Sequence, residues 1–248
     1  MLLSIVTVSY NSEKTIRKTI ESLLAQTFSD FEYFIIDGNS TDNTIQIVKE
    51  YEDAFEKKGV KFSWISEDDD GIYDAMNKGV NLCKGTHIGL LNSDDWYENR
   101  TLELVADCYK NTQADYIHGN INTFSSTYKF LKTKKPESKE KMIQRMTFFH
   151  PASFISTKIY NELGRYSLEF PICADYDFIL KIISKEYKIE YIDHTLTNFL
   201  FGGLSTSSVV AALKESHLVR VHNGYNRFLS KLYYYQSYII CKYISRSL

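Results

Sequence analysis

Residues 85–97 read Gly85-Thr86-His87-Ile88-Gly89-Leu90-Leu91-Asn92-Ser93-Asp94-Asp95-Trp96-Tyr97, and this stretch decides the fold. It begins as an apolar run of strand length and ends abruptly in Asn-Ser-Asp-Asp, which predicts a buried parallel strand. Ligands of open α/β sheets bind beyond the carboxyl ends of such strands. Two adjacent carboxylates there are costly unless a positive charge neutralises them. The stretch therefore predicts a site for Mg²⁺ or Mn²⁺, which take oxygen ligands; an acidic cap on a helix from about Asn99 is the alternative.

The chain before this stretch alternates strand and helix patterns. Strands are expected at 3–9, 31–36 and 61–66, and apolar residues at helical spacing follow each of them. This alternation predicts βαβ units and a mainly parallel sheet. All four strands end in polar, mostly acid-bearing loops: Tyr10-Asn11-Ser12, Asp37 to Asp42, Glu67 to Asp70, and Asn92 to Asp95. Because parallel strands end at the same edge of a sheet, we expect the functional site at this edge.

The second half is expected to complete the same domain. A helix at about 99–110 and a strand at 116–124 precede residues 125–146, where six lysines among Ser, Thr and Pro predict a long loop. A helix that opens with Asp175 and Asp177, and a strand-like segment over 187–200, follow. We predict an α/β fold with a mainly parallel central sheet flanked by helices over residues 1–207. Its two halves are 1–98 and 99–207, and an amphipathic helical extension covers 208–248.

Composition excludes several classes of protein. A net charge of −2 over 248 residues argues against a nucleic-acid partner. The four cysteines have no CxxC spacing, so neither zinc nor a disulfide framework is indicated. The first ten residues lack a basic leader and predict a first strand rather than a signal peptide. No apolar stretch reaches about 18 residues, so we expect no membrane span and a cytoplasmic location.

Common catalytic and phosphate-binding motifs are absent from the sequence. It contains no GxxxxGK[ST] loop, no GxGxxG after the first strand, no GxSxG and no HExxH. Acids stand at the strand ends instead, and acids repel a nucleotide diphosphate unless a metal ion mediates. A diphosphate held through Mg²⁺ or Mn²⁺ fits this pattern, because the cation stabilises charge on a leaving phosphate.

Five motifs in this order resemble those of the family 2 glycosyltransferases. They cover about residues 3–205 and read Ser4-Ile-Val-Thr-Val-Ser-Tyr-Asn11, Asp37-Gly-Asn-Ser-Thr-Asp42, Gly71-Ile-Tyr-Asp-Ala-Met-Asn-Lys-Gly79, Leu91-Asn-Ser-Asp-Asp95 and Ala174-Asp-Tyr-Asp177. The resemblance implies the Rossmann-like GT-A fold. It also implies transfer of a sugar from a nucleotide-diphospho-sugar, with residues 1–98 binding the donor and 99–207 the acceptor.

The resemblance implies donor contacts in the first half. Thr7 and Tyr10 would meet the nucleoside, Tyr10 by stacking on the base, and Asp37 would accept a hydrogen bond from a base N–H. Asp70, Asn77 and Lys78 would lie beneath the sugar and diphosphate. Other interpretations remain open for three of these residues: a turn aromatic for Tyr10, a loop-capping acid for Asp37 and a solvated helix residue for Lys78.

The metal site would form around the Asn-Ser-Asp-Asp turn. Asp94 occupies the last position of the family's DxD motif and is the expected metal ligand, with Asp95 supporting the ribose or the metal. The family often has Asp where this chain has Asn92, whose amide oxygen can ligate a hard cation but adds no charge. His150 is a further candidate for the metal or the diphosphate, with a core or loop histidine as the alternative.

The catalytic base implied by the resemblance is Asp175, which would deprotonate the acceptor hydroxyl. The family commonly has Glu at the position of Ala174, so one supporting acid is missing. Asp177 would lie on another side of the helix, as a cap or an acceptor contact. For Asp175 the alternative is a helix N-cap. A single displacement assisted by one carboxylate inverts the anomeric centre.

The predicted function is an inverting, metal-dependent glycosyltransferase that uses a nucleotide-diphospho-sugar, with UDP favoured, in cell-surface polysaccharide synthesis. The acceptor would be a saccharide or a lipid-linked sugar. The basic, aromatic tail would lie on the inner face of the plasma membrane, or else pack on the domain or form a homodimer. A turn at 202–205 would either close over the site or be a flexible turn that follows a strand. The rival hypotheses are a nucleotidyltransferase and a catalytically degenerate binding module on the same fold.

Overall fold

The computed structural model describes residues 2–202 and 209–244. The elements in chain order are β1 (Leu3–Ser9), α1 (Ile16–Leu24), β2 (Phe31–Asp37), α2 (Thr44–Lys49), α3 (Glu52–Lys58), β3 (Lys61–Ser66), α4 (Ile72–Leu82), β4 (His87–Asn92), β5 (Trp96–Tyr97), α5 (Thr101–Thr112), β6 (Tyr116–Phe124), β7 (Phe130–Lys134), η1 (Lys139–Ile143), η2 (His150–Ala152), β8 (Ser153–Ser156), α6 (Thr157–Leu163), α7 (Ala174–Ile183), β9 (Ile189–Leu200), α9 (Val209–His222) and α10 (Arg227–Ile244).

One sheet runs through the described part of the chain, in the order β3-β2-β1-β4-β8-β6-β9-β5, with β7 paired to β6. Strands β1 to β4 are parallel, as expected from the βαβ spacing. The second half is different, because β8 is antiparallel to both β4 and β6, and β5 is antiparallel to β9. The sheet is therefore mixed, with its parallel part in the first half.

The sheet must curl. Strand β5 begins four residues after β4 ends, yet it stands four places further along the sheet. The chain can connect the two only if the far edge, formed by β9 and β5, bends back toward the end of β4. This bend brings segments of the second half close to the carboxyl ends of the parallel strands.

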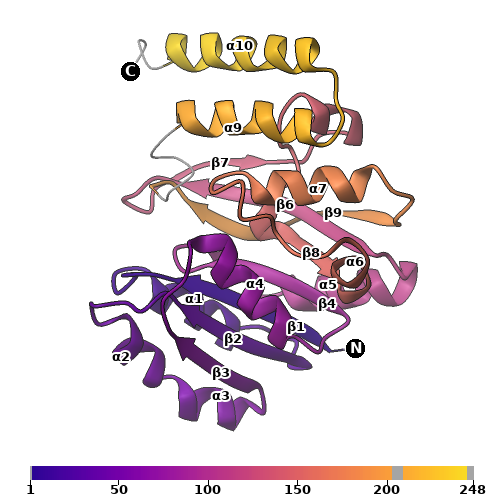
Figure 1. The fold of residues 1–248 in the computed structure, drawn as a ribbon. Coiled ribbons are helices and arrows are strands. Elements are labelled where there is room, and N and C mark those ends of the chain that lie inside the picture. Colours follow the sequence, from indigo (N-terminus) through magenta and orange to yellow (C-terminus); the bar gives the residue numbers. More distant parts are fainter. Residues whose placement is uncertain (1, 203–208, 245–248) are drawn as a thin grey trace.

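Helices cover both faces of the sheet and enclose two cores. One core holds side chains of α4, α6, α7 and α9, and the other holds side chains of α1, α3 and α5. In Figure 1, α4 and α7 lie on the face toward the viewer, and α9 and α10 stack beyond α7. Gly79 allows α4 to approach β1, since a Cβ there would lie 2.3 Å from Val6 Cγ1.

The parallel strands end together, as the acid-bearing loops predicted. Ser9 pairs with Asp37, Asp37 pairs with Ser66, and Val8 pairs with Asn92. The last residues of β1, β2 and β3 therefore form one row at the carboxyl edge, and Asn92 lies one place behind it.

Two segments differ from the sequence expectation. Residues 125–146 contain β7 and η1 rather than one long loop. The C-terminal extension is a helical hairpin, and its first helix contributes the buried Val219 to the core around α7. The proposed closing turn at 202–205 lies outside the described residues except for Gly202. Within the described part, no helix is both long and apolar enough to span a bilayer.

Candidate active site

An exposed aromatic ring marks the edge of the sheet just beyond β1. The Tyr10 side chain is 65 % exposed although it follows directly on a fully buried strand. Gly38 and Asp69 lie beside it. A Cβ on Gly38 would lie 2.4 Å from Asp69 Oδ2 and 3.5 Å from the Tyr10 ring, so the lack of a side chain at residue 38 brings the carboxylate and the ring together. Such a ring is free to stack on a flat base.

Asp37 ties together the ends of three strands. Its carboxylate is fully buried and accepts four hydrogen bonds: from the hydroxyls of Ser9 at 2.9 Å, Ser40 at 2.6 Å and Ser66 at 2.8 Å, and from the backbone N–H of Ser40 at 2.8 Å. A carboxylate offers about four lone-pair sites, all of which are used here. Asp37 is therefore placed as the loop-capping acid, and no oxygen is left for a base N–H.

Thr7 lies inside the sheet, two residues short of the edge. It is fully buried between β2 and β4, and its hydroxyl accepts a hydrogen bond from Tyr33 Oη at 3.1 Å. The strand continues to Ser9, so the first side chain that can reach a nucleoside after β1 is that of Tyr10. The expected nucleoside contact of Thr7 is thus not available in this structure.

The Asp70, Asn77 and Lys78 side chains do not share one surface. Lys78 Nζ binds the acidic loop itself, at 3.0 Å from Glu67 and 2.7 Å from the carbonyl of Asp68. Asn77 exchanges two hydrogen bonds of 2.9 Å with the backbone of Tyr166. Asp70 is exposed, and only its backbone N–H has a partner among the hydrogen bonds of the described residues. Of the three residues, Asp70 alone has a side chain that a nucleotide-sugar could reach.

The two acids of the Asn-Ser-Asp-Asp turn lie in different environments. Asp95 is fully buried, where Oδ1 accepts from the Leu200 N–H at 3.1 Å and the main-chain carbonyl accepts from Thr19 Oγ1 at 2.7 Å. Burial, followed by the charge of Asp94, raises the pKa of Asp95 well above its ordinary value. Asp94 is partly exposed, and burial raises its pKa as well. Asp95 therefore anchors β9 to the turn, and Asp94 is the accessible carboxylate.

A divalent cation fits this turn. Asn92 Oδ1 is buried and has no hydrogen-bond partner within the described part of the chain. An unpaired amide oxygen near a carboxylate of raised pKa is a hard-oxygen environment with uncompensated negative charge. No group of three or more His, Cys, Asp and Glu side chains in the described residues could hold a metal alone. If a cation binds here, the chain would supply one or two ligands, as is usual where substrate phosphates complete a Mg²⁺ shell.

Asp175 lies in the first turn of α7, and its two oxygens differ. Oδ1 accepts from the Tyr176 N–H at 2.8 Å and from Tyr73 Oη at 2.9 Å. Hydrogen bonds within the described chain leave Oδ2 without a donor, and the residue is partly exposed. One oxygen is therefore held by the protein while the other remains available to accept a proton.

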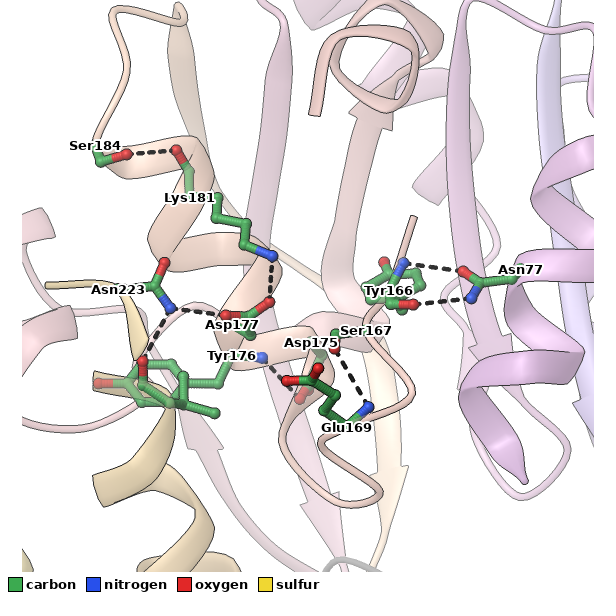
Figure 2. A network of polar contacts seen from close by, with 11 residues as sticks. Asn77, Tyr166, Ser167, Glu169, Asp175, Tyr176, Asp177, Lys181, Ser184 and Asn223 are labelled. Atoms are coloured by element: carbon green, nitrogen blue, oxygen red, sulfur yellow. Dashed lines mark hydrogen bonds and ion pairs between the residues drawn. The ribbon is translucent and has the colours of Figure 1, made fainter. Parts of the chain in front are cut away.

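Asp177 faces away from Asp175. Figure 2 shows it directed toward Lys181 and toward Asn223, which directly follows α9, at 2.6 Å and 2.7 Å. It is fully buried and links α7 to the turn after α9, so its side chain does not face the proposed site. His150 in η2 is also buried, and its Nε2 has no partner among the described residues. Burial lowers the pKa of His150 and the charge of Asp175 opposes this, so both belong to one region.

Two residues of the site were not singled out from sequence. Asp69 stands in the acidic run 67–70, and its packing against Gly38 and its hydrogen bond from the Gly71 N–H distinguish it from Asp70. Tyr73 stands four residues before Asn77 within one motif. That spacing places both side chains on one face of α4 and is a signal that could have identified Tyr73.

A mixed, curled α/β sheet with acids and an exposed aromatic ring at the ends of its parallel strands defines the GT-A class of nucleotide-sugar transferases. A family model described as glycosyl transferase family 2 matches residues 4–166. The chain belongs to this family and is a glycosyltransferase.

Known proteins of several kinds are similar to this chain. A PGL/p-HBAD biosynthesis glycosyltransferase of Mycobacterium bovis is 28 % identical over 84 % of this chain and 80 % of its own length. The chondroitin synthase of Escherichia coli is 31 % identical over 94 % of this chain, which spans only 34 % of that protein. The solved structure of S. aureus TarS 1–349 in complex with UDP-GlcNAc has a TM-score of 0.71 at 19 % identity, covering 94 % and 70 % of the two chains.

Proposed function

We propose that the chain is an inverting glycosyltransferase that moves a sugar from a UDP-sugar to a hydroxyl of a saccharide or lipid-linked acceptor in polysaccharide synthesis. The observation that carries the proposal is the Asp175 carboxylate near the edge where the parallel strands end. Its Oδ1 accepts two hydrogen bonds from the protein, and its Oδ2 accepts none from the described residues. The family membership supports sugar transfer. The similarity to a chondroitin synthase and to a UDP-GlcNAc complex supports a polysaccharide product and a UDP donor.

The proposed reaction is one displacement. Asp175 Oδ2 takes the proton of the acceptor hydroxyl, and the oxygen attacks the anomeric carbon from the face opposite the diphosphate. The bond between the sugar and the diphosphate breaks, and its electron pair leaves with the nucleotide. One attack from the opposite face inverts the anomeric configuration, so an α-linked donor gives a β-linked product.

Asp94 and Asn92 Oδ1 are the groups that would hold Mg²⁺ or Mn²⁺ together with the diphosphate. When bound, the cation neutralises charge on the departing diphosphate. Asp95 supports this arrangement indirectly, because its hydrogen bond to Leu200 fixes the turn. The unpaired Nε2 of buried His150 is a second group that could meet the diphosphate.

We assign the base-reading contact to Asp69 rather than to Asp37. Asp69 Oδ1 accepts from the Gly71 N–H at 2.9 Å, and no hydrogen bond of the described chain uses its Oδ2. That oxygen lies over Gly38 beside the Tyr10 ring. A base stacked on Tyr10 would therefore bring an edge N–H toward Asp69.

A donor screen with two variants tests the function. UDP-glucose, UDP-galactose, UDP-GlcNAc, UDP-GalNAc and GDP-mannose are compared for Mn²⁺-dependent thermal stabilisation, since a ligand that binds only the folded state raises its stability. UDP release with saccharide acceptors is then measured on the donors that bind. Asp175→Asn should keep donor binding and lose transfer by roughly 10²- to 10⁴-fold. Asp94→Ala should lose Mn²⁺-dependent binding.

Asp107→Asn is the matched control, since Asp107 is an exposed acid on α5 whose side chain makes no hydrogen bond or ion pair with a proposed site residue in the described chain. It should bind and transfer like the wild type. Transfer by Asp175→Asn at the wild-type rate would remove that residue as the base, and unchanged Mn²⁺ dependence in Asp94→Ala would remove the metal role.

We also propose that α10 lies at the inner face of the plasma membrane. Phe228, Leu232, Tyr235 and Ile239 are between 48 and 73 % exposed. Their spacing of four, three and four residues places them on one face of the helix. Between 209 and 248 the sequence has six Lys and Arg residues and only one acid, Glu215. An apolar face with a basic border is typical of helices that lie on anionic lipid.

A further inference from the structure

A hydroxyl from the donor half of the chain contacts the proposed catalytic base. Tyr73 of α4 is buried, and its Oη lies 2.9 Å from Asp175 Oδ1 and 2.8 Å from the carbonyl oxygen of Ile172. Tyr73 and Asp175 are 102 residues apart in the sequence. The contact therefore joins the first half of the fold to the first turn of α7.

We propose that Tyr73 is a positioning residue for transfer, which holds the Asp175 carboxylate so that Oδ2 receives the acceptor proton. The inference rests on the proposed function, because it assumes that Asp175 is the base. Two donors, the Tyr73 hydroxyl and the Tyr176 N–H, occupy Oδ1 and so fix the rotation of the carboxylate. A supporting hydrogen bond that keeps a reacting group aligned in this way raises the reaction rate.

The hydroxyl can serve both protonation states of the base. Tyr73 carries one hydrogen and faces two acceptors, the charged carboxylate and the Ile172 carbonyl. While Asp175 is charged, the hydrogen points to Oδ1. Once Oδ2 has taken the acceptor proton, the carboxyl group needs this donor less, and the hydrogen can turn to Ile172 without movement of any heavy atom. Burial and the charge of Asp175 raise the pKa of Tyr73, so it stays a donor throughout.

The same helix also fixes the segment that leads into α7. The Asn77 side chain, one turn after Tyr73, donates a hydrogen bond to the Tyr166 carbonyl and accepts one from the Tyr166 N–H. Figure 2 shows this pair together with Asp175. The rings of Tyr73 and Tyr166 lie 5.6 Å apart. Both side chains of α4 thus hold the approach to Asp175, but only Tyr73 touches the carboxylate.

Removal of one oxygen atom tests the inference. In Tyr73→Phe, UDP release from the best UDP-sugar of the screen should fall roughly 10- to 100-fold in kcat, the range for a hydrogen bond to a charged group. The donor KM should stay within about twofold, because uniform binding is untouched. The acidic limb of the kcat profile should move to higher pH, since the charged carboxylate loses a hydrogen-bond donor.

Tyr160→Phe is the control, because it removes another buried hydroxyl, whose one hydrogen-bond partner within the described residues is Tyr166 Oη. It should leave the pH profile unchanged. A wild-type profile for Tyr73→Phe, with Asp175→Asn inactive, overturns the positioning role, even if kcat falls. Activity in Asp175→Asn instead overturns the proposed base.

A second variant keeps the test open if Tyr73→Phe fails to fold. Fluorotyrosine at residue 73 keeps the shape of the side chain and makes its hydroxyl a stronger donor. The acidic limb should then move to lower pH, opposite to the shift in Tyr73→Phe. A limb that stays in place or moves upward contradicts the inference.

Discussion

The carboxylates of Asp37 and Asp69 lie at the same edge of the sheet, but their different hydrogen-bond partners predict opposite phenotypes. Asp37→Asn should lower the free energy of unfolding by about 1–3 kcal/mol, because an amide NH₂ would face donors that now bind a carboxylate oxygen. Asp69→Asn should leave stability near the wild type and weaken UDP binding. Urea denaturation and calorimetric titration with UDP measure the two effects. Normal stability with lost UDP binding in Asp37→Asn would restore the base contact to Asp37.

The raised pKa values at the Asn-Ser-Asp-Asp turn predict how Mn²⁺ binding depends on pH. Burial raises the pKa of Asp94, and burial plus Asp94 raises that of Asp95. Protons therefore remain bound to these groups at a higher pH than to ordinary aspartates, and they compete with the cation. Mn²⁺ affinity, measured with UDP-GlcNAc present, should fall as the pH is lowered from neutral. Asp94→Asn should bind weakly with a flatter profile, and an equally steep profile in that variant would assign the dependence elsewhere.

At the scale of elements, α9 caps the helix that carries the proposed base. Glu215 Oε1 accepts the backbone N–H groups of Ile172 and Cys173, both at 2.7 Å. A charged acceptor at this end of a helix also meets the positive end of its dipole. Glu215→Ala should lower stability by about 1–3 kcal/mol and speed hydrogen exchange over residues 172–176.

Glu215→Gln is the matched variant, since it retains one acceptor oxygen and loses only the charge. Its stability should lie between those of the wild type and Glu215→Ala. If both variants exchange and unfold like the wild type, the contact does not hold α7.

The elements found from sequence are those whose side chains face a core. Strands β1, β2 and β4 are buried along almost their whole length, so their apolar runs marked them. Strand β7 is nearly all exposed and reads Phe-Leu-Lys-Thr-Lys. Its order comes from backbone pairing with β6 and a hydrogen bond from Thr123 Oγ1 to the Lys132 carbonyl, neither of which leaves an apolar pattern.

The same reasoning explains which site residues could be predicted. The roles of Tyr10, Asp94 and Asp175 stay predictions from the family resemblance, and in the structure each residue stands just beyond a strand end or at a helix start with its side chain at least partly exposed. For Thr7, Asp37 and Asp95 the motifs predict a place at or near a strand end, but the burial of their side chains depends on register and on partners in other strands. A single sequence does not contain that information.

At the scale of the whole molecule, the chain stacks in layers, from the sheet through α7 and α9 to α10 (Figure 1). Helix α9 is hydrogen-bonded to the domain through Glu215 and Arg220, and the residue that follows it, Asn223, adds a third such contact. Helix α10 packs on α9 and leaves its other side exposed. Of the C-terminal extension, α9 therefore packs on the domain. For α10, contact with a membrane or with a second copy of the chain stays a prediction.

Charge favours the membrane over a second copy. Residues 223–248 contain Arg227, Lys231, Lys242 and Arg246 and no acid, so two α10 helices face to face would bring like charges together. Anionic lipid would instead complement them. The full chain should float with vesicles containing phosphatidylglycerol, should float less with pure phosphatidylcholine, and should be released by salt.

The double variant Phe228→Asp/Ile239→Asp should lose flotation and keep transfer to a soluble acceptor, because both side chains point to solvent. Leu168→Asp, an equally exposed apolar residue in the loop before α7, is the matched control and should float like the wild type. Sedimentation of the same samples without lipid tests the alternative that α10 forms a dimer. If the wild type does not float and sediments as a dimer, and the double variant sediments as a monomer, the exposed face of α10 binds a second copy of the chain instead.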